Sequence, residues 1–113
     1  MNQPLSEGDF VAVARFADLD ERRPAIAHVG DYEVALFLVD GDVRAYENAC
    51  PHQGGPIGEG QIEGATVTCP WHAWTFDLRT GGMALGADFA RLRRFNVRVH
   101  EGTVEVASEP EAL

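Results

Sequence analysis

Both cysteines of the chain and two of its four histidines fall within one segment, Glu47 to His72, that is rich in glycine and proline. Glycine and proline interrupt helices and strands, so this segment is expected to form loops. Short runs rich in valine, phenylalanine, leucine and alanine flank it on both sides. Loops on a rigid scaffold are a usual place for ligand-binding residues. The sequence therefore predicts that the chemistry of this protein is concentrated here.

The flanking runs have the length and punctuation of β-strands. Four strands are predicted before the first cysteine, at Phe10 to Phe16, Pro24 to Val29, Tyr32 to Val39 and Val43 to Tyr46. The third is apolar enough to be buried on both faces. Later strands are predicted where apolar and polar residues alternate, at Trp74 to Leu78, Arg94 to Val99 and Thr103 to Ala107.

No long stretch has the 3.6-residue period of a helix, and one helical turn is expected near Asp88 to Leu92. We therefore predict an all-β fold, an antiparallel β sandwich or small barrel. A chain of 113 residues has room for one domain, over residues 1–113, but not for a second catalytic domain.

The chain is acidic, with 18 Asp and Glu against nine basic residues and a formal net charge of −9. This charge repels phosphates, so neither nucleic acid nor an anionic membrane surface is an expected partner. All the basic residues are arginines, and several gather between Arg91 and Arg98. We interpret them as a solvated face, with a docking patch as the less favoured alternative.

The location is expected to be cytoplasmic. Residues Met1 to Phe10 have no basic leader followed by an apolar run, and no run of 18 apolar residues occurs anywhere. Two cysteines are fewer than a small secreted disulfide framework usually needs. They are better interpreted as metal ligands or core residues.

The ligand pattern is C-x-H followed, after sixteen residues, by C-x-x-H: Cys50-Pro51-His52 and Cys69-Pro70-Trp71-His72. Zinc accepts two thiolates and two imidazoles, but zinc fingers generally pair cysteine with cysteine and histidine with histidine. A Rieske cluster has one iron bound by two cysteines and the other by two histidines. Two loops that each supply one of each kind meet that requirement.

These motifs, with the trailing Phe76-Asp77-Leu78-Arg79-Thr80-Gly81, closely resemble the Rieske family. The resemblance implies a loop-rich cluster-binding subdomain over about residues 46–82 and one [2Fe-2S] cluster per chain. It implies that Cys50 and Cys69 bind one iron and that His52 and His72 bind the other. Backbone near the bridging sulfides is then expected from Gln53, Gly54, Gly55 and Ala73.

Two further histidines, His28 and His100, lack such neighbours and are assigned to structure or surface. Trp74 and Phe76 are expected on the core face of their strand. Trp71 lies between two predicted ligands and is a candidate for the docking surface. That surface is expected to include Gln53, Gly54, Pro56, Trp71, His72 and Gly86.

The resemblance also distinguishes among Rieske proteins. Respiratory members carry an extra cysteine in each loop and hydroxyl donors at the positions of Trp74 and Phe76, and this chain has neither. Fewer donors to sulfur favour a reduction potential at the low end of the family's range of roughly −150 to +300 mV. The chain is most similar to the ferredoxin components of bacterial aromatic-ring oxygenases. This implies an electron carrier, not an enzyme, between a flavin-dependent ferredoxin reductase and a terminal oxygenase.

Two alternatives stay open at this point. One is a Rieske-like small subunit of assimilatory nitrite reductase, and the other is a zinc-stabilised interaction module without a redox role. One departure from the family pattern is the third loop, Met83 to Phe89, which lacks the proline expected there.

Overall fold

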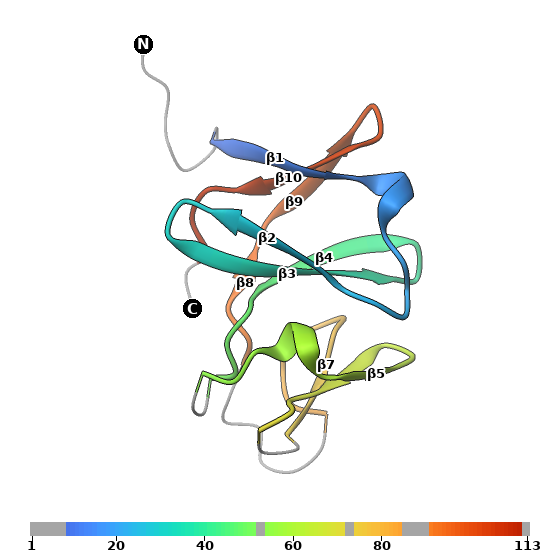
Figure 1. Ribbon diagram of the computed structural model, residues 1–113, viewed down its shortest axis with the longest axis vertical. Coiled ribbons are helices and arrows are strands. Elements are labelled where there is room, and N and C mark those ends of the chain that lie inside the picture. Colours follow the sequence, from blue (N-terminus) through green and yellow to red (C-terminus); the bar gives the residue numbers. More distant parts are fainter. Residues whose placement is uncertain (1–8, 52–53, 72–73, 85–90, 112–113) are drawn as a thin grey trace.

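The computed structural model describes residues 9–51, 54–71, 74–84 and 91–111, and its regular structure is nearly all antiparallel β (Figure 1). Within these residues the elements are β1 (Phe10–Arg15), η1 (Phe16–Asp18), β2 (Ala25–Val29), β3 (Tyr32–Val39), β4 (Asp42–Glu47), η2 (Ile57–Glu59), β5 (Gln61–Glu63), β6 (Thr66–Thr68), β7 (Thr75–Asp77), β8 (Arg94–Phe95), β9 (Val97–His100) and β10 (Thr103–Ala107). None of the helices in this part of the chain has the length and apolar character to span a membrane. The predicted all-β fold class is confirmed.

Three sheets are present in the described part of the chain, in the orders β1-β10-β9, β2-β3-β4-β8 and β5-β6-β7. The first two lie in the upper half of Figure 1 and the third lies below them. The first two sheets share one apolar core, built from Val29, Val34, Leu36, Ala45, Phe95, Val104 and Val106. The predicted antiparallel sandwich corresponds to these two sheets.

Strand β3 carries apolar side chains on both faces because both faces are covered. Val34 and Leu36 belong to the core shared by the first two sheets. Ala35, Phe37 and Val39 belong to a second core, which also contains Cys50, Cys69, Phe76 and Leu78. Since successive side chains of a strand point to opposite faces, β3 separates the two cores. The continuous apolar run read from the sequence is thereby explained.

The third sheet contains two strands that the sequence did not predict. β5 and β6 are three residues each and form a hairpin whose register pairs Gln61 with Thr68 and Glu63 with Thr66. Each strand alternates polar, apolar and polar, but three residues are fewer than the four to eight over which alternation predicts a strand. Only β7 was predicted, and it covers Thr75–Asp77 rather than the longer run from Trp74 to Leu78.

Two other predictions need correction. The run Arg94 to Val99 is not one strand, because β8 pairs with β4 and β9 pairs with β10, with Asn96 between the two sheets. Val99 is accordingly 46% exposed. The helical turn expected near Asp88 to Leu92 is wrong for the residues described there, since Arg91 forms a β-bridge with Gly82 and Leu92 is not helical. Residues 88–90 lie outside the described part.

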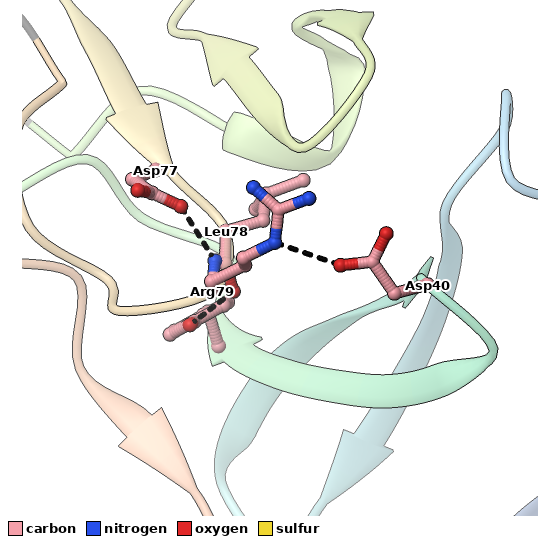
Figure 2. A network of polar contacts seen from close by, with 5 residues as sticks. Asp40, Asp77, Leu78 and Arg79 are labelled. Atoms are coloured by element: carbon pink, nitrogen blue, oxygen red, sulfur yellow. Dashed lines mark hydrogen bonds and ion pairs between the residues drawn. The ribbon is translucent and has the colours of Figure 1, made fainter.

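Polar contacts tie the third sheet to the β3–β4 hairpin. The buried Tyr46 hydroxyl in β4 donates a hydrogen bond of 2.7 Å to the Leu78 carbonyl. Close by, Arg79 Nε lies 2.7 Å from Asp40 Oδ2, and the Arg79 amide donates to Asp77 Oδ1 at 2.8 Å (Figure 2). The hydrogen bond from Arg79 lowers the pKa of Asp40. Both side chains of this ion pair are more than half exposed, so its contribution to stability is small. The buried Tyr46 bond is the stronger tie.

Candidate metal centre

Both predicted cysteine ligands lie in the interior. Cys50 is 2% exposed and Cys69 is 1% exposed, and they belong to the same hydrophobic core. They are not joined in a disulfide. The predicted histidine ligands, His52 and His72, lie outside the described residues. The structure therefore brings together the two sulfur donors of the predicted set and leaves the imidazole donors as predictions.

The two cysteine loops are closed by the same backbone hydrogen bond. The amide of Cys50 donates to the carbonyl of Gly55 at 2.7 Å, and the amide of Cys69 donates to the carbonyl of Trp74 at 2.8 Å. In each loop the acceptor is five residues after the cysteine, so each predicted histidine falls in sequence between the bonded pair. The first loop has a second bond, from the Gly54 amide to the Cys50 carbonyl at 2.7 Å. Gly54 has a φ of 81°, a conformation that favours glycine.

Gly55 is the point where the two loops meet. A Cβ atom on this residue would lie 2.9 Å from two ring atoms of Trp71 and 3.1 Å from the Sγ atom of Cys69. The backbone of the first loop therefore approaches both the sulfur and the indole of the second. Because Gly55 is also bonded to Cys50, it links the two sulfur-bearing loops. The prediction that Gly55 supplies close backbone is consistent with this packing.

Asn48 is a positioning residue that the sequence analysis missed. Its amide donates to the Glu33 carbonyl in β3 at 2.8 Å, and its side-chain oxygen accepts a 2.6 Å hydrogen bond from the Gly58 amide. Asn48 therefore fastens the first loop both to the sandwich and to η2. Asn is common in turns because its side chain hydrogen-bonds backbone groups, and this preference was the available signal in the sequence.

The aromatic residues near the second cysteine divide into core and surface. Phe76 is fully buried, and the partly buried Trp74 packs against the same core. The prediction that they line the core is confirmed. Trp71, within the Cys69 loop, is 57% exposed, so part of its ring lies at the surface. His28 and His100 are exposed and lie beside Glu33 and Glu101, as their assignment to the surface requires.

The donor set fits a cluster with sulfur ligands. Thiolate is the ligand form of cysteine, and two buried thiolates in an apolar core are costly unless a metal compensates their charge. Because Gly55 has no side chain, the backbone of the first loop lies directly against the Cys69 sulfur and the Trp71 indole. These features suit iron bound through sulfur. They do not select the metal by themselves, because zinc also binds thiolates.

Comparison with known proteins indicates iron rather than zinc. The family model described as "Rieske [2Fe-2S] domain" matches residues 9–96. The alkene monooxygenase ferredoxin component of Xanthobacter autotrophicus is 31% identical, and the match covers 97% of this chain and 93% of that protein. The anthranilate 1,2-dioxygenase ferredoxin subunit of Burkholderia cepacia is 29% identical over 79% of this chain and 82% of that protein.

Other relatives contain the matched region within a longer protein. Human apoptosis-inducing factor 3 is 29% identical over 90% of this chain, which spans only 17% of that protein. Among solved structures, the ferredoxin of carbazole 1,9a-dioxygenase from Nocardioides aromaticivorans IC177 has a TM-score of 0.82 at 26% identity, covering 90% of this chain and all of that one. A complex of reduced oxygenase and oxidized ferredoxin in carbazole 1,9a-dioxygenase contains a chain that matches with a TM-score of 0.83 at 28% identity, covering 92% of this chain and 97% of that one.

Proposed function

Because the chain belongs to the Rieske family and carries a [2Fe-2S] cluster, we propose that it is a single-electron carrier that delivers electrons to a terminal oxygenase. The observation that supports this best is the pair of buried cysteines, each in a similarly closed loop at the Rieske spacing. The ferredoxin components matched over most of their length point the same way. A carrier is not itself an enzyme, and it never contacts the oxygenase substrate.

We assign the ligands as Cys50 and Cys69 for one iron and His52 and His72 for the other. When bound, the cluster supplies a one-electron oxidation and reduction. The chain's own residues hold it and shape its surroundings. The apolar core leaves Cys50 only 2% and Cys69 only 1% exposed, and the short loop bonds at Gly55 and Trp74 fix the cysteine backbones. This rigidity limits the reorganisation that accompanies each electron transfer.

The partners form the second part of the proposal. The structure of an oxygenase–ferredoxin complex in carbazole 1,9a-dioxygenase supports an oxygenase as the acceptor. A flavin-dependent ferredoxin reductase is the proposed donor. We propose the cytoplasm as the location, since thiol ligands stay reduced there.

The first test is metal analysis of the purified protein. We expect two irons and two acid-labile sulfides per chain, because two cysteines and two histidines complete the ligand set of one cluster. The protein should be red-brown. One zinc and no sulfide would contradict the proposal and favour the interaction module instead.

The second test concerns the reduction potential. The wild-type potential is expected in the lower part of the family range of roughly −150 to +300 mV, since Trp74 and Phe76 offer no hydroxyl donor. Phe76→Tyr is expected to raise it by tens of millivolts if the new hydroxyl donates to a cluster sulfur, with about 59 mV per tenfold in the equilibrium constant. Voltammetry measures both values. A wild-type potential well above zero would contradict the argument.

The same variant has a stability readout. Phe76 is fully buried in the core, so a hydroxyl left there without a partner costs about 1–3 kcal/mol. A raised potential with unchanged thermal stability would indicate a satisfied hydroxyl. A lowered melting temperature with an unchanged potential would indicate that the hydroxyl reaches no sulfur.

The third test locates the docking surface. Trp71 is exposed next to the Cys69 loop, and exposed aromatic rings are frequent anchors of protein interfaces. We expect Trp71→Ala and Gln53→Glu to slow oxidation of the reduced carrier by its oxygenase, measured by stopped flow, without loss of iron. Val99→Ala is the matched control, because this exposed residue lies in β9 of another sheet. An unchanged rate for both loop variants would place the docking face elsewhere.

A further inference from the structure

A charged groove lies against the first cysteine loop. It has a volume of about 290 Å³ and is lined by Glu47, Ala49, Cys50, Pro51, Arg91 and Arg93. Cys50 belongs both to the buried core and to the wall of this groove. The groove therefore places ionisable side chains beside a residue that we assign as an iron ligand. Local spacing does not predict this groove, because Arg91 and Arg93 lie about forty residues after Cys50 in the chain.

Backbone bonds hold the two arginines beside the loop. The Glu47 amide donates to the Arg93 carbonyl at 2.8 Å, and the Leu92 amide donates to the Gly81 carbonyl at 2.8 Å. One guanidinium is also fixed, because Arg91 Nη2 donates to the Thr80 carbonyl at 2.8 Å. The other guanidinium, of Arg93, lies 3.7 Å from Glu47 Oε1. The charges are thus held by the fold rather than carried on a free segment.

The ionisable lining of the groove is two arginines and one glutamate, a net charge of +1 on a chain whose net charge is −9. The charge of Arg91 also acts on the protein interior. Burial raises the pKa of the Tyr46 hydroxyl, and Arg94, Arg44 and Arg91 oppose that rise. Charges at a partly desolvated surface interact more strongly than charges in bulk water.

Reduction adds one negative charge to an iron–sulfur cluster. A fixed positive charge nearby stabilises the reduced form, and a fixed negative charge destabilises it, with a strength that depends on burial and distance. We propose that Arg91 and Arg93 raise the reduction potential of this protein and that Glu47 lowers it. This inference rests on the proposed function, since it requires a cluster bound at Cys50. The reduction potential would then depend on two features: the charges in the groove and the absence of hydroxyl donors at Trp74 and Phe76.

The test uses substitutions of opposite sign in the same groove. Arg91→Gln and Arg93→Gln should each lower the potential, and Glu47→Gln should raise it. We expect each to change the equilibrium constant for reduction by about threefold, which corresponds to ~28 mV at about 59 mV per tenfold. Arg91→Lys keeps the positive charge, so its reduction potential should stay close to the wild-type value. A merely structural disturbance would not shift the two kinds of variant in opposite directions.

The matched control is Arg15→Gln, which removes the same charge from β1. The sheet β1-β10-β9 contains no residue of the groove. The potential of this variant should stay at the wild-type value. Raising the salt concentration should reduce the shifts in potential, because both arginines are exposed to solvent and their charges are screened.

Iron content is measured for every variant before the potential. Variants with two irons whose potentials match wild type, or whose arginine and glutamate changes shift the potential in the same direction, would overturn the electrostatic role while leaving the carrier function standing. A wild-type protein without iron would instead overturn the proposed function. If Arg91→Gln does not fold, because its bond to Thr80 is lost, Arg93→Gln and Glu47→Gln decide the question.

Discussion

His72→Ala is expected to lose the cluster, with iron content falling more than about tenfold below the wild-type value. An iron that loses one of its two imidazole ligands has no further histidine to replace it, since the chain has four histidines in total. The other two, His28 and His100, are exposed residues of β2 and β9. Iron and labile-sulfide analysis of the purified variant measures the loss directly.

The matched controls are His28→Ala and His100→Ala. Both side chains are more than two-thirds exposed and lie in β2 and β9, outside the third sheet. They should retain two irons and the wild-type spectrum. Retention of two irons by His72→Ala would show that His72 is not a ligand. Loss of iron from His28→Ala would indicate that His28 is one.

Gly60→Ala is expected to destabilise the protein by about 3 kcal/mol. A Cβ atom at this position would lie 2.2 Å from the carbonyl oxygen of Thr68. Because that oxygen belongs to the backbone of β6, one residue before Cys69, the strand itself must move to relieve the contact. The melting temperature should fall by roughly 10 °C or more. Both tryptophans of the chain, Trp71 and Trp74, lie near Cys69, so their fluorescence can follow the transition.

Gly64→Ala is the matched control, in the turn of the same β5–β6 hairpin. Its φ is 60°, and a Cβ there would meet nothing within 4 Å. Only the left-handed backbone conformation is then penalised, by about 1 kcal/mol. Equal losses for the two glycine variants would mean that the contact with Thr68 is not what constrains Gly60.

Local sequence determined the strands of the sandwich and the identity of the donors. The alternation and apolar runs of β1 to β4 and β10 follow from burial against one or two cores, and burial leaves a periodic signal in the chain. The donor types and their spacing are likewise local, since each loop supplies its own cysteine and its own predicted histidine. At Asn96 the local pattern is not sufficient, because the run that alternates like one strand divides there into β8 and β9, which belong to two different sheets.

Contacts between distant segments decided the rest. The meeting of the two cysteine loops depends on Gly55 lying against Trp71 and Cys69, and nothing in either loop's own sequence specifies its neighbour. The charged groove depends on the pairing of Glu47 with Arg93, which follows from how the chain returns after the third sheet. Periodicity and spacing record what a residue does within its own segment. Which surfaces then meet is set by packing, so the structure alone placed two arginines beside Cys50.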